Sequence, residues 1–137
     1  MAEHTKYPLA VAISFIDAIN HGDIDRLAAL MDKDYSLVIF GKAEEGRERG
    51  IEGWKGYSTA YPNYLIHPHR MVSEGNKAAI LGHTTGSHLG LPDDEEEKLT
   101  LVWVADVTKD GLVRTWTLLE DTPKNKRENG LGQRRKG

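Results

Sequence analysis

The chain has 137 residues, of which 39% are hydrophobic and 28% are charged, with a net charge of −3, a composition typical of one globular domain. It contains no cysteine, which excludes disulfide bonds, thiolate zinc sites and cysteine nucleophiles. No apolar run approaches the roughly 18 residues of a membrane span, and the N-terminus lacks the pattern of a secretion signal. We therefore expect a cytoplasmic protein without membrane contacts.

Charge is distributed unevenly along the chain. Residues 122–137 hold six Lys or Arg against one Glu, a net +5, whereas residues 1–121 hold 12 basic and 20 acidic side chains, a net −8. We expect a single domain over residues 1–121 and a basic, flexible tail over residues 122–137. The body is acidic and the tail lacks interleaved aromatic residues, so nucleic acid is not an expected partner. The alternative, phosphate binding by the tail, predicts affinity that falls steeply with salt.

Three helices are expected in the first half of the chain. Apolar residues at three- and four-residue spacing predict one helix over residues 8–20 and another over residues 24–31. Between them, Gly22 can take a positive φ after the first helix and Asp23 can cap the second. A third helix is expected over residues 51–61, where a proline follows.

Strands dominate the rest of the chain. Residues 35–40 predict a strand, residues 41–50 a charged loop, and the acidic run 93–97 a solvated hairpin tip. Four further strands, separated by turns, are predicted over residues 64–73, 77–89, 99–107 and 112–120. Helices followed by an antiparallel sheet predict an α+β fold, in which a curved, mostly antiparallel sheet wraps the three helices into a cone. Such a cone leaves an apolar pocket at its mouth.

Four stretches, taken in their order and spacing, resemble a known family: residues 15–23, 29–35, 85–90 and 110–116. They are similar to the nuclear transport factor two-like superfamily, in particular to its SnoaL-like and ketosteroid-isomerase-like branch. The resemblance covers residues 7–121 and implies a cystatin-like α+β roll and a homodimer formed through the open sheet. It also implies a pocket that members use for isomerisation, cyclisation, epoxide hydrolysis or binding alone, and the fold does not choose among these.

The catalytic residues of this branch are absent from the matching positions. The resemblance places Phe15, Ile39 and Trp103 where ketosteroid isomerases carry a tyrosine, a carboxylate base and an aspartate. It places Thr117 at the carboxylate position of SnoaL-like cyclases and Leu118 at the aspartate position of limonene-epoxide hydrolases. None of these side chains can act as the family's base. They make the pocket wall more apolar, which favours an apolar ligand over a charged one.

Aromatic residues are the main candidates for the pocket wall. Trp54 and Tyr57 on the third helix, with Trp103 and Trp116 on the sheet, can stack on a ring-containing ligand, although filling the core would explain each of them equally well. Glu120 shares the strand parity of Trp116, so it points into the pocket if Trp116 does. A surface salt bridge is the alternative role for Glu120.

Histidines are the remaining polar candidates. His67 and His69 share one strand face, but no third ligand is identifiable, so we expect neither a metal nor another cofactor. His83 alternates with Thr85 and Ser87, and if that face looks inward, His83 is the best general acid or base. The alternative is a histidine that is hydrogen-bonded in a partly exposed sheet.

Two functions from different classes follow. In the first, an apolar pocket binds a small hydrophobic, cyclic molecule, with His83 as the polar or catalytic contact; whether the protein is an isomerase or cyclase-type enzyme is left open. In the second, the protein is a dimeric adaptor that holds a protein partner on its open sheet face, and its own side chains fill the pocket. The residues expected to line the pocket are Phe15, Ile39, Trp54, Tyr57, His67, Trp103, Trp116, Leu118 and Glu120.

Overall fold

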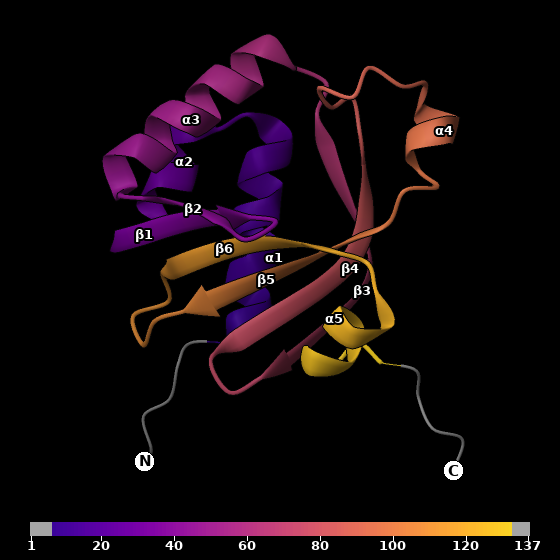
Figure 1. Ribbon diagram of the computed structural model, residues 1–137. Coiled ribbons are helices and arrows are strands. Elements are labelled where there is room, and N and C mark those ends of the chain that lie inside the picture. The colour runs from indigo at the N-terminus through magenta and orange to yellow at the C-terminus, as the bar shows by residue number, and fades with distance from the viewer. Residues whose placement is uncertain (1–6, 133–137) are drawn as a thin grey trace.

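The computed structural model describes residues 7–132, and Figure 1 shows their arrangement. The elements in chain order are α1 (Pro8–His21), α2 (Ile24–Ala29), β1 (Met31–Ile39), β2 (Lys42–Glu45), α3 (Arg47–Ala60), β3 (Leu65–Glu74), β4 (Lys77–Thr85), α4 (Asp93–Glu96), β5 (Leu101–Val107), β6 (Val113–Glu120) and α5 (Pro123–Glu128). No helix in this part of the chain combines the length and hydrophobicity needed to cross a lipid bilayer.

The strands form one curved, mixed sheet in the order β2-β1-β6-β5-β4-β3. Within residues 7–132, β1 and β6 pair in parallel, and the other four neighbouring pairs are antiparallel. The helix α1 packs against β3, β4 and β5, while α3 crosses β1 and β2. This arrangement confirms the predicted α+β fold with a mostly antiparallel sheet wrapped around N-terminal helices.

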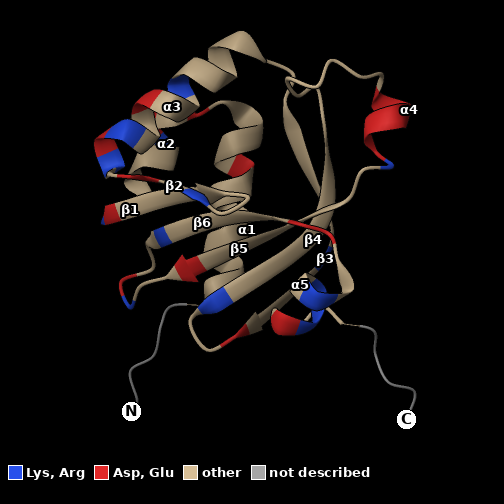
Figure 2. Ribbon diagram, in the orientation of Figure 1, with Lys and Arg blue, Asp and Glu red and all other residues tan. Residues whose placement is uncertain are grey.

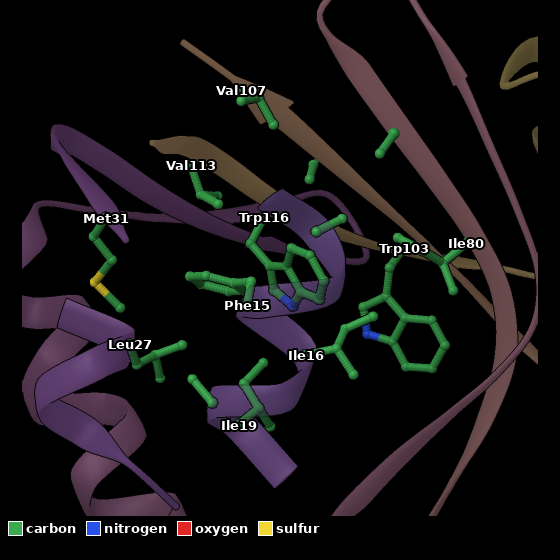
Figure 3. Close-up of a cluster of buried hydrophobic side chains, with 14 of the residues drawn as sticks. Phe15, Ile16, Ile19, Leu27, Met31, Ile80, Trp103, Val107, Val113 and Trp116 are labelled. Atoms are coloured by element: carbon green, nitrogen blue, oxygen red, sulfur yellow. The ribbon is translucent and has the colours of Figure 1, made fainter. Parts of the chain in front are cut away.

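The core lies between α1 and the inner face of the sheet. Phe15 and Ile16 from α1 are buried against Trp103 and Trp116 from β5 and β6 (Figure 3). The ring centres of Phe15 and Trp116 lie 4.7 Å apart. Burying each of these large side chains contributes about 1.5–3 kcal/mol to folding. Because strand residues alternate between faces, Trp103 and its cross-strand neighbour Ile80 both point inward.

The boundary between α2 and β1 differs from the prediction. The helix α2 ends at Ala29, and β1 begins at Met31 instead of Tyr35. The cause is pairing with β6, because the Val113 amide donates a hydrogen bond to the Leu30 carbonyl at 2.7 Å and Met31 lies opposite Val113. Tertiary pairing therefore overrides the helical periodicity of the local sequence.

The segment 41–50, predicted as a loop, contains the edge strand β2 and the first residues of α3. Phe40 and Gly41 have positive φ values of 48° and 87°, which is the geometry of a tight hairpin turn. All four residues of β2 are exposed, and each is charged or small. The sequence therefore shows no apolar alternation that would indicate a strand here. The missed strand is typical of a sheet edge, where charge discourages further pairing.

The C-terminal segment packs on the outer face of the sheet. Thr122 caps α5 by accepting a hydrogen bond from the Asn125 amide. Leu131 is only 2% exposed and packs with Val102 and Val104. The part of the predicted tail that the structure describes therefore contains a helix and a buried leucine, and its remainder, residues 133–137, lies outside the described residues. Figure 2 marks both basic and acidic positions on the α5 ribbon, whereas the α4 ribbon is acidic.

Candidate functional site

A cavity of about 430 Å³ opens between α3 and the inner face of the sheet. We call it the aromatic cavity. Its sheet wall consists of Ile39 from β1, Trp103 from β5, and Trp116 and Leu118 from β6. These strands place the four side chains together because Leu118 lies directly opposite both Ile39 and Trp103 in the strand register.

The helix wall consists mainly of Trp54 and Tyr57. The Trp54 indole donates a hydrogen bond to the Tyr35 hydroxyl at 3.3 Å, which fixes the orientation of its ring. Burial raises the pKa of Tyr35 to about 12, so this hydroxyl stays neutral. A glycine, Gly50, lets the helix approach the Tyr35 ring closely, since a Cβ there would lie 2.5 Å from that ring.

Six predicted ligand-binding residues therefore line the aromatic cavity, and the other three, Phe15, His67 and Glu120, do not. The six are Ile39, Trp54, Tyr57, Trp103, Trp116 and Leu118. Phe15 is fully buried behind the wall, where it supports the Trp116 ring. Glu120 is exposed at the end of β6, and its carbonyl accepts a hydrogen bond from the Asn125 side chain at 2.9 Å.

One end of the aromatic cavity is polar. The Tyr57 hydroxyl lies 2.9 Å from His88 Nδ1 and accepts a hydrogen bond from the His88 amide at 3.1 Å. The Tyr64 ring meets the Tyr57 ring edge to face, with ring centres 4.9 Å apart. Burial raises the pKa of both Tyr57 and Tyr64 above the ordinary value for tyrosine. Both phenols are therefore neutral hydrogen-bonding groups near neutral pH.

Sequence reasoning did not assign Tyr64 or His88 to the site. The predicted strand over residues 77–89 ends at Thr85, because Gly86 has a φ of 69° and turns the chain over the end of α3. A Cβ at Gly86 would lie 2.3 Å from the Asn63 carbonyl oxygen, so only glycine fits this close approach. The glycine was the signal that the strand stops before His88.

Two charged residues, Glu44 and Arg49, lie at the rim of the aromatic cavity. Both are exposed, Glu44 on β2 and Arg49 in the first turns of α3. They belong to the segment that was predicted as a charged loop, which is why they were not candidates. Because these two charges lie at the rim, the interior of the cavity is apolar and aromatic.

His83 and His67 lie outside the aromatic cavity, on the outer face of the sheet. Their rings stack at 4.5 Å, and His83 Nδ1 lies 2.7 Å from His69 Nε2. Burial and the two neighbouring histidines lower the pKa of His83. The role of His83 as general acid or base was conditional on an inward direction, and the inward residues of β4 are Ala78 and Ile80, of opposite parity.

These histidines have the character of hydrogen-bonded residues in a partly exposed sheet. His67 Nε2 lies 2.8 Å from the Thr85 hydroxyl, on the same outer face. Among residues 7–132, no group of three or more His, Asp or Glu side chains has an arrangement that could hold a metal ion. The histidine cluster lies on the face of the sheet opposite the aromatic cavity.

Four residues of the acidic run 93–97 are exposed, as its charge predicted, and Glu96 is the exception. The run forms the single-turn helix α4, and Glu96 is 1% exposed. The Glu96 carboxylate accepts a hydrogen bond from the Thr84 hydroxyl, and a long one of 3.5 Å from the Ser87 amide. These bonds compensate the cost of burying a charge. The bond to the Ser87 amide also fixes the backbone immediately before His88.

The geometry defines a cystatin-like α+β roll with one aromatic cavity, and the sequence assigns the family. Residues 12–116 match the SnoaL-like domain family, so the chain belongs to that family. Among solved structures, a cystatin-fold protein from Novosphingobium aromaticivorans superposes with a TM-score of 0.72 at 19% identity, covering 84% of this chain and 99% of that one. Among curated proteins, no sequence matches the chain.

Two further solved structures have the same fold. An NTF2-like protein from Cytophaga hutchinsonii superposes with a TM-score of 0.66 at 14% identity, covering 91% of this chain and 97% of that one. SalBIII, an epoxide hydrolase/cyclase-like enzyme, superposes with a TM-score of 0.66 at 16% identity, covering 82% and 88%. The predicted family and fold are thereby confirmed, and at these identities the likeness concerns the fold alone.

Proposed function

We propose that the protein binds a small, largely apolar, ring-bearing molecule in the aromatic cavity. The observation that carries this proposal is an open volume of about 430 Å³ walled by Trp54, Trp103 and Trp116. That volume lies in the range of small-molecule sites, which are concave, mostly apolar and supplied with a few polar groups. Flat aromatic side chains stack on rings and contribute about 0.5–1.5 kcal/mol beyond the area they bury.

The chemistry of the wall selects against strongly charged ligands. A charged group placed between Ile39, Trp103 and Leu118 would lose its hydration without gaining a partner. The polar groups gather at the Tyr57 and His88 end, so the ligand carries its oxygen or nitrogen atoms at one end. The likeness to SalBIII, which is described as acting in pyran ring formation, supports a ring-bearing ligand.

The adaptor alternative assumed that the protein's own side chains fill the pocket. The aromatic cavity is open, and α5 with Leu131 covers part of the outer sheet face that an adaptor would use. Small-molecule binding therefore explains the structure better. Homodimerisation stays a prediction of the family resemblance.

Filling the aromatic cavity tests the proposal. We expect 2-methoxynaphthalene, an apolar two-ring probe, to bind the purified protein in isothermal titration calorimetry. Leu118→Trp should fill the cavity and weaken this binding at least tenfold, about 1.4 kcal/mol. Thr117→Trp is the matched control, since Thr117 is the adjacent residue on the opposite face of β6, and it should bind the probe as the wild type does.

Two results would contradict the proposal. The first is that the wild-type protein fails to bind the probe. The second is that Leu118→Trp and the wild type bind it equally well. Circular dichroism of both tryptophan variants establishes that each is folded before the affinities are compared.

A further inference from the structure

The hydroxyl of Tyr57 can form one more hydrogen bond, which a ligand can supply. The hydroxyl oxygen accepts from the His88 amide at 3.1 Å and lies 2.9 Å from His88 Nδ1. In the tautomer of His88 that carries its proton on Nε2, Nδ1 accepts the Tyr57 proton. A hydroxyl has one donor and two acceptor positions, so one lone pair on Tyr57 remains available. Tyr57 and His88 both line the aromatic cavity. A ligand that donates a hydrogen bond can therefore join this pair.

Tyr64 supplies the complementary group. Its side chain lines the same cavity, and its hydroxyl forms no hydrogen bond with any other residue in the described part of the chain. The edge-to-face contact at 4.9 Å holds its ring against that of Tyr57. The same cavity thus contains a free donor on Tyr64 and, with His88 in this tautomer, a free acceptor on Tyr57. A ligand hydroxyl satisfies both groups, whereas a ketone or ether oxygen can use only the donor.

We propose that Tyr57, His88 and Tyr64 form a proton relay that ionises the hydroxyl of a phenolic or enolic ligand. In this step the ligand O–H bond breaks and its proton passes to the Tyr57 oxygen, while the Tyr57 proton passes to His88 Nδ1. The ligand oxygen keeps the bonding electron pair and becomes a phenolate or enolate, hydrogen-bonded by Tyr64. His88 becomes an imidazolium, and Tyr57 ends as the neutral phenol. This inference rests on the proposed function of the same cavity.

The surroundings favour this distribution of charge. Burial raises the pKa values of Tyr57 and Tyr64, so the negative charge stays on the more acidic ligand. The buried Glu96 carboxylate contacts the residue before His88, which places a negative charge near the new imidazolium. His88 is exposed, so it can pass its proton to water.

Other titratable groups face the relay from neighbouring elements. The Tyr61 ring lies 4.7 Å from the ring of Tyr57 and 6.2 Å from that of His88. At the rim, Arg49 provides a positive charge that attracts an anionic ligand, and Glu44 opposes it. Any pH dependence of binding therefore has to be assigned by substitution of Tyr57 and His88 themselves.

Two matched probes test the relay. One is 4-nitrophenol, whose phenolate absorbs visible light, and the other is 4-nitroanisole, which has a methyl ether in place of the hydroxyl. We expect 4-nitrophenol bound to the wild-type protein to ionise about one pH unit below the free probe, a tenfold change in its acidity. Tyr57→Phe and His88→Gln should each abolish this shift. Tyr64→Phe should weaken 4-nitrophenol binding about tenfold by removing the donor to the phenolate.

Binding of 4-nitroanisole separates the relay from the cavity. Substitution of Tyr57 or His88 should abolish the shift of 4-nitrophenol while changing the affinity for the ether much less, whereas Tyr64→Phe should weaken both probes, because an ether oxygen can also accept a hydrogen bond from Tyr64. Circular dichroism establishes that each variant is folded. The relay is refuted if the wild type shows no downward shift, or if the shift persists in both Tyr57→Phe and His88→Gln. If 4-nitroanisole fails to bind even the wild type, the proposed binding function is the part that fails.

Discussion

Gly50 sets the distance between α3 and the sheet. Its hydrogen lies against the Tyr35 ring, whose hydroxyl in turn accepts the hydrogen bond from Trp54. A side chain at position 50 would push the helix outward and displace the helix wall of the aromatic cavity. One small residue thus connects backbone packing to the shape of the site.

Gly50→Ala should destabilise the protein by about 1–3 kcal/mol, because a Cβ would lie 2.5 Å from the Tyr35 ring. Gly56→Ala is the control in the same helix, since a Cβ there meets no atom within 4 Å. The control should be neutral or gain up to about 1 kcal/mol, because alanine favours helix more than glycine does. Urea unfolding measures both values. Equal stability of the two variants would show that α3 does not depend on this close contact.

Strand parity decides which of the predicted side chains line the aromatic cavity. Trp103, Trp116 and Leu118 are large and apolar, so their inward direction follows from the need to bury them. His83 and His67 are amphipathic, and their direction depends on the register that pairs Ile80 with Trp103. That register is set by contacts between strands and has no local signal in the sequence.

The element α5 closes part of the outer sheet face. Thr122 caps it, and Leu131 follows it into a small apolar cluster with Val102 and Val104. Its basic composition suggested a solvated tail, yet one leucine beyond the helix is enough to anchor the segment. Lysine stems can lie along apolar surface while their charges stay in water. The composition therefore predicted that this segment is basic but not that it packs on the outer face of the sheet.

Leu131→Ala should release this anchor and cost about 2 kcal/mol of unfolding free energy, the lower end of values for buried leucines because a terminal segment can detach. Leu89→Ala is the control, since Leu89 is 51% exposed and should change stability by less than about 0.5 kcal/mol. Thermal unfolding of both variants measures the difference. A neutral Leu131→Ala would mean that the segment contributes nothing to the fold.

Asp121 connects α5 to the start of β5. Its carboxylate accepts a hydrogen bond from the Thr100 hydroxyl and lies 3.1 Å from Lys126 Nζ. The Thr100 hydrogen bond and the Lys126 ammonium hold the pKa of Asp121 below its ordinary value of 3.8. Since the folded-state pKa is the lower one, this stabilisation is fully present above the unfolded value. It is lost as the pH falls through the folded-state pKa.

Acidification should therefore destabilise the wild-type protein more than the Asp121→Asn variant. Between about pH 5 and about pH 2.5, the wild-type protein should lose more unfolding free energy than the variant, whose side chain does not titrate. Urea unfolding at several pH values gives the comparison. Other acidic groups titrate in both proteins and cancel. Parallel stability curves for the two proteins would exclude Asp121 as a source of acid sensitivity.

At the scale of the whole molecule, the curved sheet packs solidly at one end and stays hollow at the other. Phe15, Ile16 and Ile80 fill the solid end, and the aromatic cavity occupies the end under α3. The sequence predicted this arrangement because helices precede the strands and the apolar faces can be buried in few ways. It could not predict the β1–β6 pairing or the turn at Gly86, which depend on contacts between distant segments.

The parallel pairing of β1 with β6 joins the beginning of the domain to its end. Ile39 lies opposite Leu118 in this pair, and both form the wall of the cavity. During synthesis on the ribosome, β1 has no sheet neighbour on that side until β6 has emerged. A nascent chain consequently lacks the aromatic cavity until β6 has been synthesised. A ligand of the cavity that is present during translation can stabilise the fold only from that point on.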